Sequence, residues 1–133
     1  MGIGKQSKTL NKNQIEMIRS FLRSKRNGLR NEIIFLLSVK SGLRSKEISL
    51  LSWKMVCKSD GSLDDYINLP NSSSKGKSGR IIPLHKDLKI LLPKLLEKHK
   101  RNRYFDINSN FVVRTERSPF TTSQCIVNMF FKW

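Results

Sequence analysis

The segment from Asn27 to Gly42, NGLRNEIIFLLSVKSG, constrains the fold more than any other part of the chain. When it is arranged as a helix, its apolar residues, among them Ile33, Ile34 and Leu37, cover that helix nearly all round. Such a helix is expected at the centre of a core, because it has no polar face to turn toward water. Gly42 stands where a residue with left-handed backbone commonly ends a helix. The segment therefore predicts a buried helix on which the other elements pack.

Two further helices are expected beside this segment. In LNKNQIEMIRSFL, Asn11 can cap a helix, and Gln14 can return the hydrogen bond as in a capping box. The apolar stripe of this first helix consists of Ile15, Ile18 and Leu22. A short helix is predicted from Ser45 to about Leu51, with Ser45 as its cap and Glu47 in the first turn, where a negative charge is favourable.

The hydrophobic period changes after Trp53, where short strands become the expected structure. The stretch KMVCKSDGSLDDYINLP is typical of a strand, a turn at Asp60-Gly61, and a second strand that contains Ile67. The following GRIIPL is typical of a third strand. Three short strands in succession predict an antiparallel meander, with residues 72–78 in the loop between its second and third strands.

The remainder of the chain is predicted to be helical again. In HKDLKILLPKLLEKHKR, Pro93 lacks a backbone donor, so it predicts either a kink or the first turn of a second short helix. A last helix is expected in PFTTSQCIVNMFFKW, capped by Thr121 or Thr122. The predicted fold class is α+β, mainly helical with a small three-stranded antiparallel sheet. Residues 10–133 would form one domain, preceded by a flexible basic start at residues 1–9.

The charge balance points to a polyanionic partner. The 133-residue chain has 26 Lys and Arg residues against 10 Asp and Glu residues, a formal net charge of +16. Such an excess repels itself in a compact fold, and nucleic acid is the leading partner, with a membrane surface second. No apolar run approaches the length of a membrane span, and the first residues lack a signal-peptide pattern, so a cytoplasmic protein is expected. Cys57 and Cys125 lie far apart, which disfavours a metal site, and no cofactor is expected.

The stretch SSSKGKSGRIIPL contains part of a nucleotide-binding loop, but its surroundings favour another reading. A P-loop requires a leading glycine, and here that position is Asn71. It must also join a strand to a helix, whereas a strand is expected after Arg80. A basic hairpin loop could instead lay Lys75, Lys77 and Arg80 along a nucleic-acid backbone, since no acidic residue lies between Asp65 and Asp87. A solvated charged loop is the alternative.

Two motifs resemble those of the tyrosine recombinases, the phage-integrase family. SGLRSKEISLLSWKMV is similar to the first family box, T-G-L-R-x-x-E-L-x-x-L-x-W, with Arg44, Glu47, Leu51 and Trp53 at the matching positions. In KGKSGRIIPL, Lys75 stands eight residues before Pro83, as the family lysine does before its proline. The start of the first predicted helix also looks like the entry to the family's catalytic domain. The resemblance extends from about Leu10 to the last residue.

The resemblance implies a function for these residues on DNA. In the family, a tyrosine attacks a DNA phosphodiester, and charge develops on the nonbridging oxygens. Arg44 would stabilise that charge, because a guanidinium donates parallel hydrogen bonds to phosphate. Lys75 would protonate the departing 5'-oxygen as a general acid, and Glu47 would orient neighbouring cations. Predicted DNA contacts, beside these three catalytic candidates, are Lys46, Lys77, Arg80, Thr121, Thr122, Ser123 and Gln124.

Other family features do not appear in this sequence. The family's H-x-x-R box is not matched, because Leu88 follows His85 at the third position and Asn102 follows His99. Neither Tyr66 nor Tyr104 stands where the family has its nucleophile. The resemblance therefore covers the first half of the catalytic domain, and a shortened recombinase that contacts double-stranded DNA without cutting it is the leading hypothesis.

Two alternatives remain open at this stage. The chain could be a DNA-binding regulator that pairs with a complete recombinase, or a small basic protein that binds RNA. If the last helix leaves its apolar residues exposed, self-association or pairing with a recombinase would follow. These residues are Ile126, Val127, Met129, Phe130 and Phe131.

Overall fold

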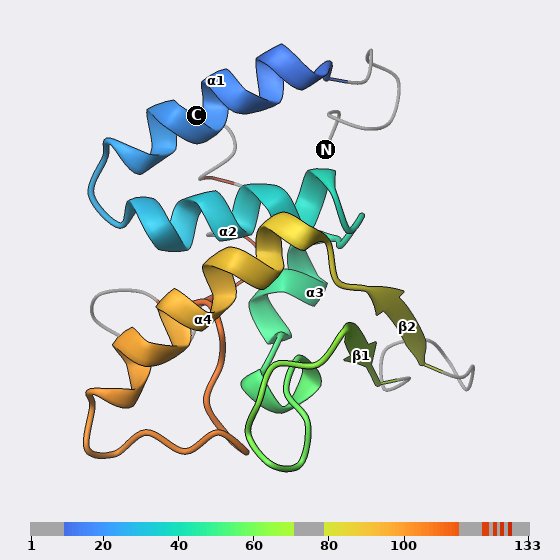
Figure 1. The fold of residues 1–133 in the computed structure, drawn as a ribbon, viewed down its shortest axis with the longest axis vertical. Helices are drawn as coiled ribbons and strands as arrows, with labels where there is room; N and C mark the ends of the chain where they lie inside the picture. The colour runs from blue at the N-terminus through green and yellow to red at the C-terminus, as the bar shows by residue number, and fades with distance from the viewer. Residues whose placement is uncertain are drawn as a thin grey trace.

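The computed structural model describes residues 10–70 and 79–114, together with residues 121, 122, 124, 126 and 128. Its elements follow in the order α1, α2, α3, η1, β1, β2 and α4, where η1 is a 3-10 turn (Figure 1). Their bounds are Lys12–Arg23, Gly28–Val39, Ser45–Leu50, Trp53–Met55, Tyr66–Leu69, Arg80–Pro83 and Lys86–Lys100. None of the described helices is long and apolar enough to cross a membrane. The α+β fold class, mainly helical with a small antiparallel sheet, is confirmed.

The helix α2 occupies the centre, as its apolar residues predict. It lies between α1 and α4 in Figure 1, and its residues Ile33, Ile34 and Leu37 have no exposed surface. Gly42 has φ 71°, and the N–H of the next residue, Leu43, donates to the Leu37 carbonyl, which closes the helix end. The predicted glycine cap is therefore confirmed.

The start of α1 also matches its prediction. The side-chain oxygen of Asn11 accepts from the Gln14 backbone N–H at 2.8 Å, and the Gln14 side chain accepts from the Asn11 N–H at 2.9 Å. This reciprocal pair is the predicted capping box. Ile15 and Leu22 are buried on the face that α1 turns toward α2.

The cap of α3 differs from the prediction by one residue. The residue at the cap position is Arg44, with extended backbone, and Ser45 is the first helical residue. Glu47 then supplies what Ser45 was expected to supply, because its carboxylate accepts from the Arg44 backbone N–H at 2.9 Å. The polar contact at the helix start therefore comes from the third residue of the helix and not from the first.

The sheet has two strands in the described residues, where three were predicted. β1 and β2 pair antiparallel, with Tyr66 opposite Pro83 and Leu69 opposite Arg80. The segment expected to form the first strand instead begins as the 3-10 turn η1 and then makes one isolated bridge, Cys57 to Leu63. Trp53 is buried in the core, and the backbone carbonyls of Ser52 and Trp53 accept turn hydrogen bonds from the N–H groups of Met55 and Val56.

The helix α4 is continuous through Pro93, so of the two predicted outcomes the start of a second short helix at Pro93 is wrong. Proline removes one backbone donor, but apolar burial on both sides of it holds the helix together. The fully or nearly fully buried residues of α4 are Leu88, Leu91, Leu92, Leu95 and Leu96. Its first N–H groups are capped by His85, whose Nδ1 accepts from the Asp87 backbone N–H at 3.1 Å.

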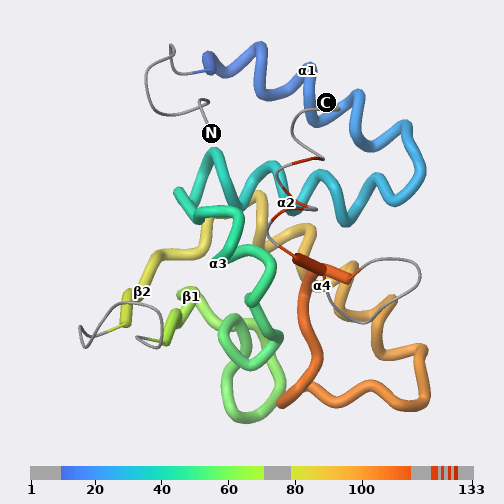
Figure 2. Tube along the Cα trace, turned by 180° about the vertical axis from the view of Figure 1, so that it is seen from behind, coloured from blue at the N-terminus to red at the C-terminus, as the bar shows by residue number. Residues whose placement is uncertain are grey.

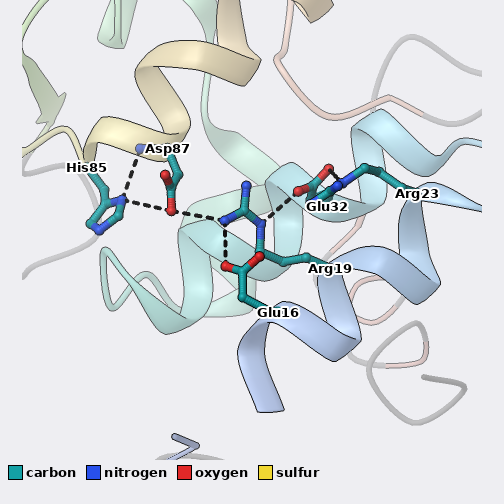
Figure 3. Close-up of polar contacts among 6 residues, drawn as sticks. All are labelled: Glu16, Arg19, Arg23, Glu32, His85 and Asp87. Carbon is teal, nitrogen blue, oxygen red and sulfur yellow. Dashed lines mark hydrogen bonds and ion pairs between the residues drawn. The ribbon is translucent and has the colours of Figure 1, made fainter. Parts of the chain in front are cut away.

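A cluster of ion pairs around the buried Glu32 joins α1, α2 and α4 (Figure 3). The side chain of Glu32 is 1% exposed, and its two oxygens accept from Nε of Arg19 at 2.7 Å and Nε of Arg23 at 3.1 Å. Nη1 of Arg19 also contacts Glu16 and Asp87, each at 3.0 Å. The one charged residue buried in the middle of α2 is thereby paired, which a buried carboxylate requires.

The 3.7 Å contact between His85 Nδ1 and Asp87 Oδ2 in Figure 3 is not an ion pair. The Nδ1 lone pair already accepts from the Asp87 N–H, so that nitrogen carries no proton.

The segment after α4 returns to the core. The backbone N–H of Trp53 donates to the Asn110 carbonyl, and Ser52 forms an isolated β-bridge with Phe111. Residues 110–114 therefore lie beside the turn at η1 (Figure 2). Further on, Ile126 has no exposed surface. The prediction that the apolar side of the last helix stays exposed is therefore wrong for Ile126. Val127, Met129, Phe130 and Phe131 lie outside the described residues.

Candidate nucleic-acid interface

Several of the predicted site residues surround one pocket. A surface pocket of about 380 Å³ is formed by α3, the turn η1 and the end of β1. Arg44, Lys46 and Glu47 supply its polar side chains. Its apolar side consists of Leu50, Met55, Leu69 and Pro70. The pocket therefore combines two cations and one carboxylate with an apolar wall.

Arg44 is placed at the pocket by the end of α2 and the start of α3. The left-handed turn at Gly42 reverses the chain, and Leu43 is buried in the core. Arg44, the next residue, is exposed and extended at the start of α3. Because the buried Leu43 fixes the backbone, the exposed side chain of Arg44 is held where it can contact an anion in solution.

Glu47 connects the first box to the strand pair. Its Oε1 accepts from the Arg44 backbone N–H at 2.9 Å and also from Nη2 of Arg80 at 3.0 Å. Arg80 lies 33 residues further along the chain, on β2. Because one oxygen accepts both bonds, Glu47 holds the Arg80 guanidinium next to the start of α3. The half-exposed Arg80 keeps donors that point to solvent or to a ligand.

The loop predicted to carry two lysines starts at this pocket and ends near it. It follows Pro70, which lines the pocket, and precedes Gly79 and Arg80, the latter bonded to Glu47 of the pocket. A side chain at position 79 would clash, since an added Cβ would come within 2.0 Å of the Leu69 carbonyl oxygen. The glycine thus allows the two ends of the loop to approach. Lys75 and Lys77 themselves lie outside the described residues.

The predicted DNA contacts near the C-terminal end differ in burial. Thr121 is 6% exposed, so its hydroxyl faces the protein, whereas Thr122 and Gln124 are exposed. The Gln124 side-chain amide donates to Asn128 at 3.1 Å. Within the described ranges, none of these residues lines the Arg44 pocket. Ser123 lies outside the described residues.

The histidines and tyrosines of the described chain have other surroundings. His99 is 9% exposed, and its Nδ1 accepts from the indole N–H of Trp53 at 3.0 Å. Burial, followed by the charges of Arg114 and Lys98, lowers the pKa of His99 to about 4. Tyr66 and Tyr104 are exposed at 48% and 77%. None of these groups lines the Arg44 pocket.

The pocket is suited to a phosphate group. Arg44 and Lys46 line it, Glu47 holds the Arg80 guanidinium close by, and guanidinium forks match phosphate oxygens. The apolar residues beside them lower the local dielectric, which strengthens each contact. No group of three His, Cys, Asp or Glu side chains in the described ranges is arranged to hold a metal ion.

Two features of the site were not anticipated from the sequence. The Glu47 to Arg80 ion pair joins segments whose approach depends on the tertiary fold, so no local pattern could predict it. The buried cluster around Glu32 had a visible signal, since a carboxylate within an otherwise apolar helix requires a buried cation. Arg19 and Arg23, four residues apart on α1, share one helix face and could have been proposed as its partners.

Comparison with known proteins identifies the class of fold first. The chain is similar to the Tn1549 transposon integrase in complex with circular intermediate DNA, at 18% identity and a TM-score of 0.51, covering 96% of this chain and 46% of that one. A variant of that integrase, in complex with another circular intermediate DNA, has 16% identity and a TM-score of 0.52, covering 99% and 48%. The fold is that of an integrase, and the chain spans less than half the length of either solved structure.

The family follows from the sequence itself. The model of the Phage integrase family matches residues 8–129, which is nearly the whole chain. No curated protein matches the chain. The chain therefore belongs to the phage integrase family, a family of DNA integration and recombination, as the two motifs predicted.

Proposed function

We propose that this chain binds double-stranded DNA through its backbone phosphates, with the Arg44 pocket as the principal contact. The observation that carries the proposal is that two exposed cations, Arg44 and Lys46, line one pocket, while Glu47 of the same pocket holds Arg80 from a separate segment beside them. The solved integrases to which the chain is similar were captured on DNA, which supports the same ligand here.

Arg44 and Lys75 would hold one phosphodiester between them. Arg44 would donate to the nonbridging oxygens, and Lys75 would lie beside the 5'-oxygen, since its loop starts after Pro70 of the pocket and ends before Arg80, which is bonded to Glu47. Glu47 would keep Arg80 in position through the 3.0 Å ion pair. Lys46 and Lys77 would add further phosphate contacts, and the exposed Thr122 and Gln124, with Ser123, would contact DNA from the last helix.

We also propose that these 133 residues do not cleave DNA on their own. Cleavage in this family requires a second arginine with its histidine and a tyrosine, and this sequence has no H-x-x-R. His99 is unsuited to proton transfer at this pocket, because it is buried and bonded to Trp53. The binding surface would therefore serve a recombinase only together with further residues.

The affinity of the chain for a duplex, measured by fluorescence anisotropy at several salt concentrations, tests the binding proposal. With ~4 to 6 phosphate contacts, log affinity should fall against log salt with a slope of about −4 to −5. A slope near zero, or a preference for structured RNA over duplex DNA, would contradict the proposal.

A suicide-substrate assay tests the second part. The substrate carries a nick that traps any covalent protein–DNA intermediate, and the expected result is binding without an adduct. A covalent adduct formed by this chain would show that it holds a nucleophile. If a complete recombinase is added, unchanged binding and recombination would count against a role as its partner.

A further inference from the structure

A second basic pocket lies apart from the Arg44 pocket. It has a volume of about 300 Å³ and is formed by the start of α2, the end of α4 and the segment that follows α4. In Figure 1 the start of α2 and the end of α4 lie on the left of the molecule, whereas β1 and β2 lie on the right. The two pockets share no lining residue.

The lining of this pocket carries positive charge from three elements. Arg30 comes from α2, Lys98 from α4 and Arg114 from the segment beyond it. The residues that line it, within the described ranges, include no Asp or Glu. A positive charge near the C-terminal end of α4 also stabilises that helix through its dipole. This role explains Lys98, but not Arg30 or Arg114, which lie outside α4.

Arg30 is held in position by neutral oxygens. Its Nη1 donates to the Arg114 carbonyl at 3.0 Å, and its Nε and Nη2 donate to the Asn31 side-chain oxygen at 3.0 and 2.9 Å. These bonds fix the orientation of the guanidinium. Among the described residues, no carboxylate forms an ion pair with Lys98 or Arg114.

A buried donor lies in the same lining. His99 is nine-tenths buried, and its Nδ1 accepts from Trp53, so the neutral ring carries its proton on Nε2. No other side-chain hydrogen bond of His99 is found within the described part of the chain. The first turn of α2 has no acidic residue, and this positive end of the helix dipole lies at the pocket.

We propose that this pocket, between Arg30, Lys98, His99 and Arg114, binds a phosphate group as a second anion site of the chain. Its volume equals that of roughly ten liquid water molecules, so a hydrated phosphate group fits. Arg114 and Lys98 supply the charge, Arg30 completes it, and the His99 Nε2–H adds one neutral hydrogen bond. The phosphate comes either from a DNA backbone or from a small phosphate-bearing molecule, and the DNA source rests on the proposed function.

Nuclear magnetic resonance of the full chain tests this site, with inorganic phosphate and a short duplex as the two ligands. The indole N–H of Trp53 is the reporter, because it is bonded to the opposite nitrogen of the His99 ring. A Trp133→Phe variant distinguishes the two indole signals. The test variant is Lys98→Gln with Arg114→Gln, and the matched control is Lys12→Gln with Lys94→Gln, two exposed lysines outside the pocket.

Phosphate is expected to shift the Trp53 signal saturably, with chloride at equal ionic strength giving no such shift. The test variant should weaken phosphate binding about tenfold, as the loss of two charge-assisted contacts predicts, while the control changes it less than about twofold. If duplex DNA displaces phosphate, the DNA backbone is the source. If it does not, and the test variant keeps its DNA affinity, a small phosphate-bearing molecule is the source.

The site is overturned if phosphate up to tens of millimolar gives no saturable shift and both double variants have equal DNA affinity. Equal weakening of phosphate binding in the test and control variants would also overturn it, since net charge alone would then explain the effect. The test of this pocket can fail or succeed independently of the test of the proposed function. Failure of the wild-type chain to bind DNA contradicts that function, whereas the phosphate titration still tests the pocket.

Discussion

Arginine and glutamate occur together in two regions of this molecule, with opposite consequences. In the cluster at α1 and α2, the carboxylate of Glu32 is 1% exposed and contacts two arginines. At the Arg44 pocket, the carboxylate of Glu47 is 21% exposed and contacts the half-exposed Arg80. Burial and pairing, and not residue type, decide which charges hold the fold and which remain available for a ligand. The same reasoning separates Arg19, which is 12% exposed, from the exposed Arg44.

The largest expected difference between the two regions is in stability. Glu32→Gln and Glu47→Gln each remove one negative charge, so the two variants have equal net charge. Glu32→Gln should lower the free energy of unfolding by roughly 3 kcal/mol, because it removes the buried carboxylate that pairs with Arg19 and Arg23, although Arg19 keeps Glu16 and Asp87. Glu47→Gln should lower it by less than about 1 kcal/mol. Urea denaturation measures both values.

Equal destabilisation by the two glutamine variants would contradict the difference in stability between the two regions. A small loss at Glu32 would mean that water or local rearrangement compensates for the missing charge. In that case the ion pairs of Glu32 would stabilise the fold no more than the pair between Glu47 and Arg80 does.

The next effect concerns pH and the buried end of α4. The pKa of His99 is lowered to about 4, first by burial and then by Arg114 and Lys98. The unfolded chain binds this proton near the ordinary histidine pKa of about 6.5, so stability is full above that pH. As the pH falls from 6.5 to 4, the folded state should lose roughly 2 to 3 kcal/mol relative to the unfolded state.

His99→Gln is the matched control for this pH effect. Glutamine keeps an oxygen that accepts from the Trp53 indole N–H but binds no proton in this range. The difference between the stability curves of the wild-type chain and the variant should therefore appear between pH 6.5 and 4. Parallel curves would show that His99 does not carry the effect, because the carboxylates titrate in both proteins.

The smallest expected effect is the stabilisation of the fold by the ion pair between Glu47 and Arg80. A double-mutant cycle with Glu47→Gln and Arg80→Gln should give a coupling free energy below about 1 kcal/mol. This coupling should shrink in high salt, because solvent screens exposed charges. A coupling of several kcal/mol that persists in high salt would mean that the pair stabilises the fold as the Glu32 cluster does.

Patterns that depend on neighbours in the chain could be predicted, and contacts between distant segments could not. The capping box at Asn11, the glycine at position 42 and the burial of α2 follow from local spacing and hydrophobicity. The first box predicted Arg44 and Glu47 as neighbours on α3, and both line the pocket. The link from Glu47 to Arg80 depends on how the strand pair docks beside α3, which no local pattern encodes.

The missed elements have physical reasons as well. The segment after Trp53 has strand-forming residues, but burial of the indole and the return of residues 110–112 beside it favour a 3-10 turn. Pro93 was expected either to kink the helix or to begin a second short one, yet α4 continues through it because buried leucines on both sides outweigh one lost hydrogen bond. Tertiary packing overrode the local preference in both places.

The central claim is that the exposed charges at the Arg44 pocket bind DNA phosphates. Its most direct test is the salt dependence of duplex binding for the wild-type chain, for Arg44→Gln, and for Lys12→Gln as a control of equal net charge. Arg44→Gln should weaken binding about fivefold to a hundredfold and reduce the salt slope by about 0.9, with its stability unchanged. If Arg44→Gln and Lys12→Gln bind DNA with the same affinity and slope, the pocket is not the phosphate contact and the claim is contradicted.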